Sequence, residues 1–393
     1  MTGLPEGSNS HSPRYWRTPA QGPRILFFSG GSALRGLTRC LKRSTWNTIH
    51  IVTPFDSGGS SAAIRDAFHM LSVGDLRNRL LALAEEGGDG DSALYHMLAF
   101  RLPSDGDPME LRQRLARIVE GNDPLIDAVR EPSRTVMREM LGSCAEALPA
   151  SFDLRGACMG NLVLAGGYLR EGNAIEPVLD TIAEYVQVRG TVRPVTAEDL
   201  HLGARLVDGT EIVGQHNLTG KESAPIGAPV DEIYLLRDGA RVRATASADA
   251  IDLIGGADMI VYPMGSFFTS VLCNLLPRGI GRAIAASPAP KIFLPNAGKD
   301  PEQVGMGIED CVHRIVHAVR RDAGADTPVD RILNTVVLDR IDDLYAKVEV
   351  GSLLDMRLTM GGFEVLRLPL SQECAGIQRY DPALVSEALL SLA

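Results

Sequence analysis

Three short apolar segments of this chain each end in a loop of small polar residues, and this repeated arrangement constrains the fold more than any other feature. The segments are residues 24–28, 48–52 and 259–262, and a helical pattern follows each loop. Short apolar runs that alternate with amphipathic helices indicate parallel strands in β-α-β units. The sequence therefore predicts a Rossmann-like α/β fold, in which three layers surround a parallel sheet, with a helical insertion and a small antiparallel hairpin.

Composition divides the 393-residue chain into four segments. Residues 1–23 are rich in Ser, Pro and Gly without periodicity, which predicts a disordered tail. Residues 24–102 carry the first half of the α/β pattern. Residues 103–155 are charged and helically spaced without strand signals, which predicts a helical insertion. Residues 156–393 complete the α/β core and contain the third loop.

Within this last segment, two helices are expected between residues 160 and 185, followed by strands and further helices. Residues 190–217 alternate around Asp208-Gly209, which favours a hairpin at an antiparallel edge. The α/β pattern is expected to resume with a strand at 232–236. The elements expected after it are a helix at 248–254, strands at 291–294, 335–338 and 363–366, and a helix at 382–392.

The three loops are expected to lie at one edge of the sheet, because parallel strands share the direction of their C-terminal ends. Glycine lets backbone N–H groups approach an anion, and a following helix N-terminus adds partial positive charge. A lone glycine pair is more often a structural turn, but three such loops favour a nucleotide diphosphate site. The candidates in the first two loops are Gly30, Gly31, Ser32, Gly58, Gly59 and Ser60.

Two aspartates accompany these loops. Asp56 opens the second loop with no helix to cap, which favours binding of Mg²⁺ or a substrate hydroxyl over stabilisation of the loop. Asp75 begins a helical pattern, so it can cap that helix, bind a ligand, or do both. Mg²⁺ prefers few carboxylates together with phosphate oxygens, and this arrangement could supply both.

Composition and missing motifs disfavour several classes of protein. A formal net charge of −10 opposes a nucleic-acid surface. The absence of a long apolar run and of a signal peptide predicts a cytoplasmic protein without membrane contact. The six cysteines are widely spaced and are expected to be reduced core thiols. No histidine metal pattern, GxSxG elbow, Walker A motif or GxGxxG fingerprint is present.

An ordered series of motifs resembles the family that joins 2-phospho-L-lactate transferase (CofD) to the gluconeogenesis factor YvcK. The resemblance runs from about residue 24 to the C-terminus and is interrupted by the helical insertion. YvcK-like members usually have an aspartate pair where this chain has Asp56-Ser57. The matching motifs are Ser29-Gly30-Gly31-Ser32, Asp56-Ser57-Gly58-Gly59-Ser60-Ser61, Gly74-Asp75-Leu76-Arg77-Asn78, Gly160-Asn161-Leu162, Gly265-Ser266-Phe267-Phe268-Thr269-Ser270, Asn274-Leu275-Leu276 and Tyr380-Asp381-Pro382.

The resemblance implies a Rossmann-like homodimer that holds a nucleotide diphosphate between the first and third loops. In the transferase branch, a phospholactyl group moves from a guanosine-diphosphate-linked donor to a deazaflavin hydroxyl, with Mg²⁺ and release of GMP. Asp56 and Asp75 would then be catalytic and would bind the metal or the acceptor. In the YvcK branch, the same cleft is a nucleotide-sugar sensor. The further ligand-binding residues implied are Asn78, Asn161, Gly265, Ser266, Thr269 and Ser270.

Two functions stay open. We favour a Mg²⁺-dependent transferase that uses a GDP- or UDP-type donor, because phosphoryl transfer needs positioning and charge neutralisation more than a covalent nucleophile. The alternative is a non-catalytic regulator that binds a nucleotide sugar and contacts a protein partner through the helical insertion. A dehydrogenase is disfavoured because the chain lacks GxGxxG.

Overall fold

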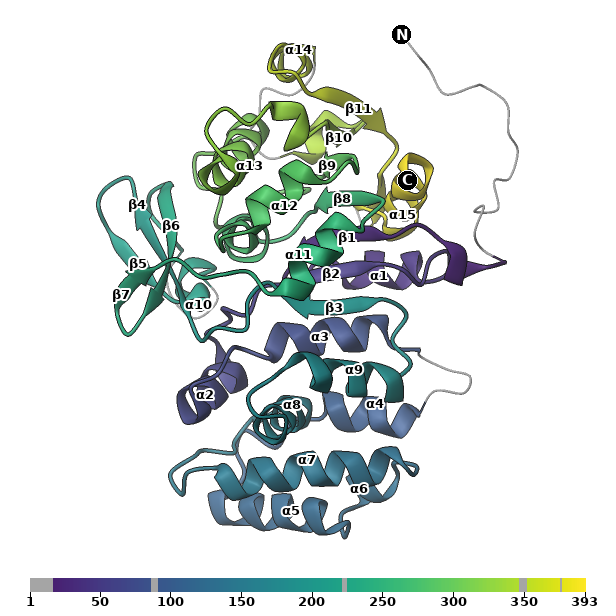
Figure 1. The fold of residues 1–393 in the computed structure, drawn as a ribbon, viewed down its shortest axis with the longest axis vertical. Helices are drawn as coiled ribbons and strands as arrows, with labels where there is room; N and C mark the ends of the chain where they lie inside the picture. The colour runs from purple at the N-terminus through teal and green to yellow at the C-terminus, as the bar shows by residue number, and fades with distance from the viewer. Residues whose placement is uncertain (1–16, 86–90, 221–224, 346–351, 375–376) are drawn as a thin grey trace.

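A seven-stranded parallel sheet forms the centre of the molecule (Figure 1). The computed structural model describes residues 17–85, 91–220, 225–345, 352–374 and 377–393, so most of the expected tail at 1–23 lies outside the described residues. Every neighbouring strand pair of this sheet is parallel, which confirms the predicted fold class. In spatial order the strands are β11 (Glu364–Leu368), β10 (Thr335–Asp339), β9 (Lys291–Phe293), β8 (Met259–Tyr262), β1 (Ile25–Ser29), β2 (Ile49–Val52) and β3 (Thr191–Pro194).

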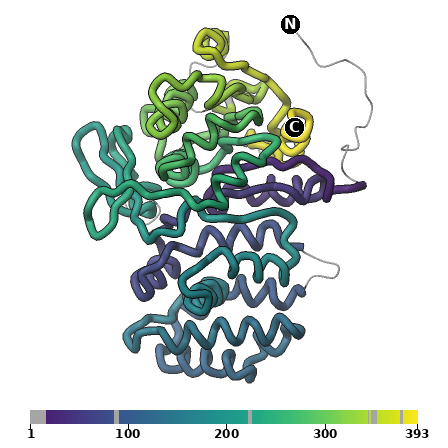
Figure 2. Tube along the Cα trace, viewed as in Figure 1, coloured from purple at the N-terminus to yellow at the C-terminus, as the bar shows by residue number. Residues whose placement is uncertain are grey.

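The strand order places a change of direction between β1 and β8. From β1 the chain adds β2 and β3 on one side, and it then crosses to β8 and adds β9, β10 and β11 on the other. Figure 2 shows the N-terminal trace of β1 beside the much later trace of β8. Ligands of open α/β sheets bind outside the C-terminal ends of the strands at such a switch point. The loops after β1 and β8 are therefore the expected place for a ligand.

Alternate side chains of the central strands face two different helical layers. On one face, Ile25 and Phe27 pack with α1 and α15, and on the other, Leu26 and Phe28 pack with α11, α12 and α13. This alternation is the period of two that a strand imposes. The helices are α1 (Arg35–Leu41), α2 (Gly59–Phe68), α3 (Gly74–Leu83), α4 (Ser92–Ala99), α5 (Pro108–Glu120), α6 (Pro124–Asp127), α7 (Ser133–Ala147), α8 (Met159–Arg170), α9 (Glu176–Tyr185), α10 (Gln215–Leu218), α11 (Ala248–Gly255), α12 (Ile280–Ala286), α13 (Ile308–Ala323), α14 (Ser352–Met360) and α15 (Pro382–Leu392).

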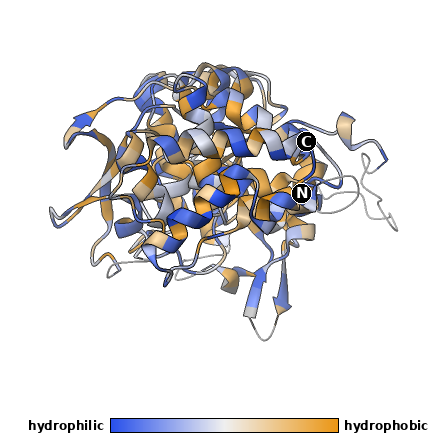
Figure 3. Cartoon of the chain, turned by 90° about the horizontal axis from the view of Figure 1, so that it is seen from below, coloured by the Kyte–Doolittle hydropathy of each residue, from blue (hydrophilic) through white to orange (hydrophobic). Residues whose placement is uncertain are grey.

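The segment predicted as a helical insertion contains α5, α6 and α7. Its buried side chains share one hydrophobic cluster with α3, α4, α8 and α9, below β3 in Figure 1. The view from below shows hydrophilic residues on outer helix faces and hydrophobic residues inside (Figure 3). The cluster therefore continues beyond the predicted insertion on both sides, and the boundaries at 103 and 155 stay a prediction.

The antiparallel part is larger than predicted. The predicted hairpin forms from β4 (His201–Leu206) and β5 (Glu211–Val213), but β6 (Val230–Arg237) and β7 (Ala240–Val242) complete a four-stranded sheet of order β5-β4-β6-β7. The assignment of residues 232–236 to the resumed α/β pattern is therefore wrong, since β6 pairs with β4 in antiparallel fashion. A second Asp-Gly turn, at Asp238-Gly239, explains it: both residues have positive φ, as a tight hairpin requires. A separate antiparallel pair joins β12 (Ser371–Cys374) to β13 (Ile377–Tyr380).

Three smaller expectations also need correction. Residues 191–194, at the start of the predicted hairpin segment, join the parallel sheet as β3. The helix expected after the third loop is a π turn at Phe267–Val271 and a 3₁₀ turn at Leu272–Leu275, with no α-helix before Ile280. All six cysteines are unpaired, but Cys40 and Cys374 lie partly or fully exposed rather than in the core. In the described part of the chain, no helix is long and apolar enough to cross a membrane.

Candidate functional site

The loops after β1 and β8 touch one another at the switch point. We call residues 30–34 the β1 loop and residues 263–270 the β8 loop. A Cβ atom on Gly30 would lie 2.5 Å from the Ser270 Oγ, and one on Gly265 would lie 3.4 Å from the Ala33 Cβ. Gly265 also has a φ of +145°, which side chains rarely allow. Glycine at these two positions therefore lets the two predicted loops meet, as expected.

The first turn of α3 lies against the β1 loop. A Cβ atom on Gly31 would lie 2.3 Å from the Asp75 Oδ1 and 3.0 Å from the Asn78 Nδ2. Val73, not Asp75, occupies the N-cap position of α3, so the simple capping interpretation of Asp75 is wrong. Asp75 instead lies in the first turn, where the helix dipole favours a carboxylate. The predicted residues Gly31, Asp75 and Asn78 are thus brought together.

The β2 loop, residues 53–58, approaches the same helix from the other side. The Asp56 Oδ1 accepts a hydrogen bond of 3.2 Å from the Gly58 N–H. The Asp56 Oδ2 lies 3.0 Å from the point that a Gly74 Cβ would occupy, and the Ser61 Oγ lies closer still. Asp56 and Asp75 therefore flank the start of α3. Gly58 is the N-cap residue of α2, and Gly59 has a φ of +48°.

The start of α8 completes this side of the site. The backbone N–H of Cys158 donates a 3.1 Å hydrogen bond to the Ser60 Oγ. The Asn161 Nδ2 lies 3.5 Å from the hydroxyls of both Ser60 and Ser61. These contacts join the predicted residues Ser60 and Asn161, which are 101 positions apart in sequence.

A buried carboxylate, Glu302, holds the second half of the β8 loop. Its Oε2 accepts hydrogen bonds from the backbone N–H groups of Phe268, at 2.9 Å, and Thr269, at 3.0 Å. Its Oε1 accepts a 2.5 Å hydrogen bond from the Thr269 hydroxyl. The side-chain hydroxyl and the amide of Thr269 are thus both bonded to this chain's own carboxylate. A phosphate could reach that amide only by displacing Glu302.

Asn296 and Asp300 hold the first half of the β8 loop. Asn296 Oδ1 accepts from the Gly265 N–H at 2.7 Å, and its Nδ2 donates to the Gly265 carbonyl oxygen at 2.6 Å. Asp300 Oδ2 accepts from the Phe267 N–H at 2.9 Å. Burial raises the pKa of Asp300, while burial and the nearby Asp300 charge raise the pKa of Glu302 to about 7.

Sequence reasoning missed this segment, which we call the β9 loop (residues 294–307). The signal was present, because Pro295-Asn296-Ala297-Gly298 follows the predicted strand at 291–294 as the other loops follow theirs. The rule that placed three strand ends at one edge also applies to this strand. Its residues lack the run of glycine and serine that marks the other three loops, so that pattern did not predict it as part of the site.

Two buried guanidinium groups lie on α3. Arg79 is fully buried and donates to the Gly30 carbonyl oxygen at 2.8 Å and to the Thr38 Oγ1 at 3.0 Å. Arg77 contacts the Cys158 Sγ and the Asn78 Oδ1. Among the described residues, neither guanidinium has a carboxylate oxygen within 4.0 Å. Burial lowers the pKa of Arg79 only to about 10, so both groups are cations at neutral pH.

Buried polar atoms without a partner among the described residues lie near the loops of the switch point. The Asn274 Nδ2 donates to the backbone carbonyls of Ser29 and Ser270, but its Oδ1 has no hydrogen-bond partner in the part of the chain that the structure describes. The same holds for the Ser29 Oγ and the Asn161 Oδ1. Buried polar groups are normally hydrogen-bonded, so such groups are consistent with a ligand or water at these loops.

The residues fit Mg²⁺ only if a ligand supplies phosphate oxygens. No group of three or more His, Cys, Asp or Glu side chains in the described ranges could hold a metal ion. Asp56 and Asp75 provide two carboxylates near the start of α3, Asp56 beside Gly74 and Asp75 in the first turn. Mg²⁺ typically takes one or two carboxylates together with substrate phosphates and water. These two aspartates therefore do not form a metal site from protein ligands alone.

Comparisons with known proteins match most of this chain to a known family. The model of the family described as 2-phospho-L-lactate transferase CofD matches residues 25–351. A putative gluconeogenesis factor from Nostoc is 30% identical over 296 residues, which cover 75% of this chain and 52% of that protein. The gluconeogenesis factor of Bacillus subtilis is 26% identical over 377 residues, which cover 95% and 98%.

The lengths of these relatives differ. The chain spans about half the length of the relatives from Nostoc and Clostridium acetobutylicum, and nearly all of the Bacillus protein. A crystal structure of protein BH3568 from Bacillus halodurans aligns with a TM-score of 0.65 at 22% identity, covering 94% of this chain and all of that one. This likeness shows that the fold is shared.

Proposed function

The chain belongs to the CofD family, and we propose that it is a transferase that binds a nucleotide-diphosphate-linked donor at the crevice between β1 and β8. The donor would be of GDP or UDP type, and it would pass a phosphate-linked group, of the 2-phospholactate kind, to an acceptor hydroxyl. Among all features of the site, the contact between the β1 and β8 loops beside Asp75 supports this proposal most directly.

The electrostatics of α3 agree with an anionic ligand. Arg79 places a buried positive charge next to the β1 loop, and Arg77 places a second one against Cys158 at the start of α8, while the charge of Asp75 acts on both. A buried cation costs free energy unless an anion offsets it. The diphosphate would offset this charge, while Arg79 holds the loop through the Gly30 carbonyl oxygen.

The proposed reaction needs no covalent enzyme intermediate. The acceptor oxygen forms a bond to the phosphorus of the transferred group, and the bond from that phosphorus to the nucleoside monophosphate breaks. Asp56 accepts the proton of the acceptor hydroxyl, and the β1 loop amides stabilise charge on the leaving phosphate. Mg²⁺, held by Asp56, Asp75 and phosphate oxygens, would neutralise further charge. Asn78, Ser266 and Ser270 would orient the donor.

The test is a ligand panel followed by a point variant. GDP, GMP, UDP-sugars and NAD, each with and without Mg²⁺, are screened by thermal shift, and stabilising ligands are incubated with acceptors before mass spectrometry. Asp56→Asn should abolish turnover and leave the affinity for GDP within about threefold. Unchanged turnover in Asp56→Asn would remove Asp56 from the mechanism.

A second function is favoured by the names of the relatives, which are gluconeogenesis factors. In this alternative the same crevice binds a nucleotide sugar without turnover, and the surface of α5 and α7 contacts a protein partner. A nucleotide sugar that raises the melting temperature but is recovered intact would support the regulator over the transferase. A homodimer and a cytoplasmic location are also part of the proposal, and light scattering and cell fractionation would test them.

A further inference from the structure

A cavity of about 550 Å³ lies in the β9 loop, outside the residues assigned above to the diphosphate and to Asp56. Its lining includes Lys299, Asp300, Val304 and Met306, together with backbone from three glycines. The apolar side chains and Lys299, the cation among its described lining residues, make this cavity different in character from the glycine-serine loops. Its volume is within the range of small-molecule sites in proteins.

The cavity adjoins the β8 loop through Asp300. Asp300 lines the cavity, and its carboxylate also accepts hydrogen bonds from the Phe267 N–H of the β8 loop and from the Asn296 Nδ2. Asn296 in turn bonds both backbone groups of Gly265, so side-chain hydrogen bonds link the β8 and β9 loops. Strand β9 is the neighbour of β8, and neighbouring strands lie about 4.8 Å apart, so the β9 loop is one strand away from the switch point.

The two sides of the crevice are chemically unequal. On the β2 side are Asp56 and Asp75, which suit a reaction centre, and on the β9 side is a partly apolar cavity whose carboxylate, Asp300, already accepts hydrogen bonds from the Phe267 N–H and the Asn296 Nδ2. A nucleoside has an apolar face, and the transferred group of a donor lies at the opposite end of its diphosphate. The order of the loops along the sheet edge therefore defines a direction for the ligand.

We propose that the cavity in the β9 loop binds the nucleoside end of the ligand, so that the diphosphate crosses from β9 past β8 and β1 and ends at Asp56. This inference rests on the proposed nucleotide site, and it adds the orientation of the ligand within it. Lys299, which is exposed, lies on the nucleoside side and can interact with the ribose or the first phosphate. Val304 and Met306 provide the apolar surface against the base.

The test compares a nucleotide with a ligand that has no nucleoside. Isothermal titration calorimetry with Mg²⁺ measures the affinities of GDP, UDP and inorganic pyrophosphate for the full chain and for Met306→Trp, which fills the cavity. We expect the variant to lose at least about tenfold in affinity for GDP or UDP and to keep its pyrophosphate affinity within about twofold. Lys299→Trp changes an exposed residue and should show the same selective loss if Met306→Trp does not fold.

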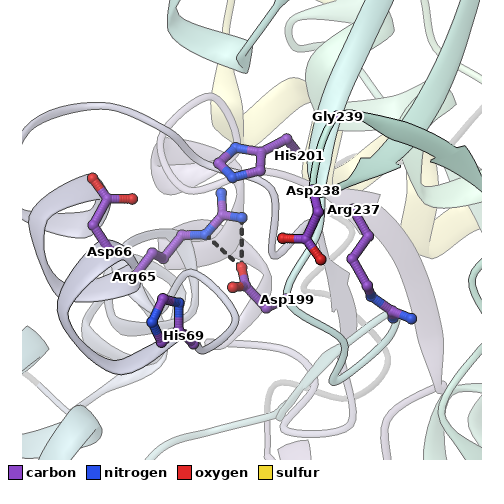
Figure 4. A pocket seen from close by; sticks show the side chains of 8 residues that line it. All are labelled: Arg65, Asp66, His69, Asp199, His201, Arg237, Asp238 and Gly239. Carbon is purple, nitrogen blue, oxygen red and sulfur yellow. Dashed lines mark hydrogen bonds and ion pairs between the residues drawn. The ribbon is translucent and has the colours of Figure 1, made fainter.

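Asp66→Trp is the matched control. Asp66 is exposed and lines the cavity of about 570 Å³ in Figure 4, between α2 and the antiparallel sheet, so the control adds the same bulk to a cavity of similar size. It should leave all three affinities unchanged. Equal losses of nucleotide and pyrophosphate in Met306→Trp, or no loss in either cavity variant, would overturn the orientation. A wild-type protein that binds pyrophosphate no more weakly than GDP and UDP would also overturn it. Binding of none of the three would instead defeat the nucleotide site itself.

Discussion

The two walls of the crevice carry opposite buried charges. On the β1 wall, Arg77 and Arg79 are buried cations with no carboxylate within ion-pair distance among the described residues. On the β8 wall, Asp300 and Glu302 are buried carboxylates, and the same part of the chain offers them no cation within that distance. One wall therefore has two buried cations against the charge of one nearby carboxylate, Asp75, while the other uses its backbone N–H groups to bind its own carboxylates.

This difference gives the two walls different roles, binding of an external anion on the β1 wall and support of the loop on the β8 wall, which the sequence alone could not distinguish. The β1 wall is suited to receive an anion from outside, because its cations have only neutral partners within hydrogen-bond distance. On the β8 wall, the backbone N–H groups of residues 265 and 267–269 are already bonded to side chains of the β9 loop. The side chains of Ser266 and Ser270 are therefore better placed than these N–H groups to bind the proposed ligand. Preorganisation of one wall lowers the ordering cost of binding on the other. Each prediction below changes one wall.

The largest effect is expected for Glu302→Ala. This change leaves the N–H groups of Phe268 and Thr269 and the Thr269 hydroxyl buried without their acceptor. At about 1–3 kcal/mol for each unsatisfied buried donor, we expect unfolding free energy to fall by roughly 3–5 kcal/mol. Urea denaturation measures this loss. Glu302→Gln, which keeps an acceptor oxygen, should lose less than about half as much, and equal losses would show that Glu302 does not hold the loop.

The pH dependence of stability is the next largest effect. Burial raises the pKa of Glu302 from an ordinary 4.5 to about 7, so its folded-state pKa lies above its unfolded-state pKa. The contribution of Glu302 to stability is then fully present below about pH 4.5 and is lost as the pH rises through about 7. The raised pKa of Asp300 acts in the same direction.

Denaturation of the wild type and of Glu302→Gln between pH 5 and pH 8 checks this prediction. The variant keeps every other titratable group, so the difference between the two curves reports Glu302 together with its effect on the neighbouring Asp300. We expect the wild type to lose up to about 3 kcal/mol relative to the variant as the pH rises. Parallel curves would contradict a buried, proton-binding Glu302.

Much of the fold and part of the site could be predicted because local patterns determine them. The apolar runs and the loops after them located β1, β2 and β8, and the rule for parallel strands placed their loops at one edge. Gly30, Gly31 and Gly265 were found because they lie in these loops; close contacts require glycine at the first two positions, and a φ of +145° favours it at Gly265. Their specific role in ligand binding stays a prediction.

The rest depends on contacts between distant residues that no local pattern encodes. Glu302 meets Thr269 across 33 positions, and Arg79 meets Gly30 across 49. The strand at 232–236 was misassigned because an isolated β pattern does not show which sheet it joins, and only pairing with β4 decides this. The π turn at the end of the β8 loop was also not predicted. The N–H groups of its first three residues bond to Asp300 and Glu302, which lie more than 30 positions away.

The smallest expected effect tests the β1 wall through Arg79→Met. The variant removes a buried charge, which favours the folded state, but it also removes the donor of the Gly30 carbonyl oxygen and the Thr38 hydroxyl, so the unfolding free energy of the ligand-free protein should change by no more than about 2 kcal/mol. Affinity for GDP should fall by about 10–100-fold, since the Gly30 loop loses its charged donor and the ligand loses a nearby cation.

Arg193→Met is the opposite control for that prediction. Arg193 on β3 pairs with Asp180 and Asp249, at 2.6 and 2.7 Å, away from the β1 and β8 loops. Its loss should lower stability and leave GDP affinity unchanged, because the carboxylates that it neutralises belong to the protein itself. If Arg79→Met instead loses stability as Arg193→Met does and still binds GDP, the charge of Arg79 serves the fold, and the contrast between the two walls has no bearing on the ligand.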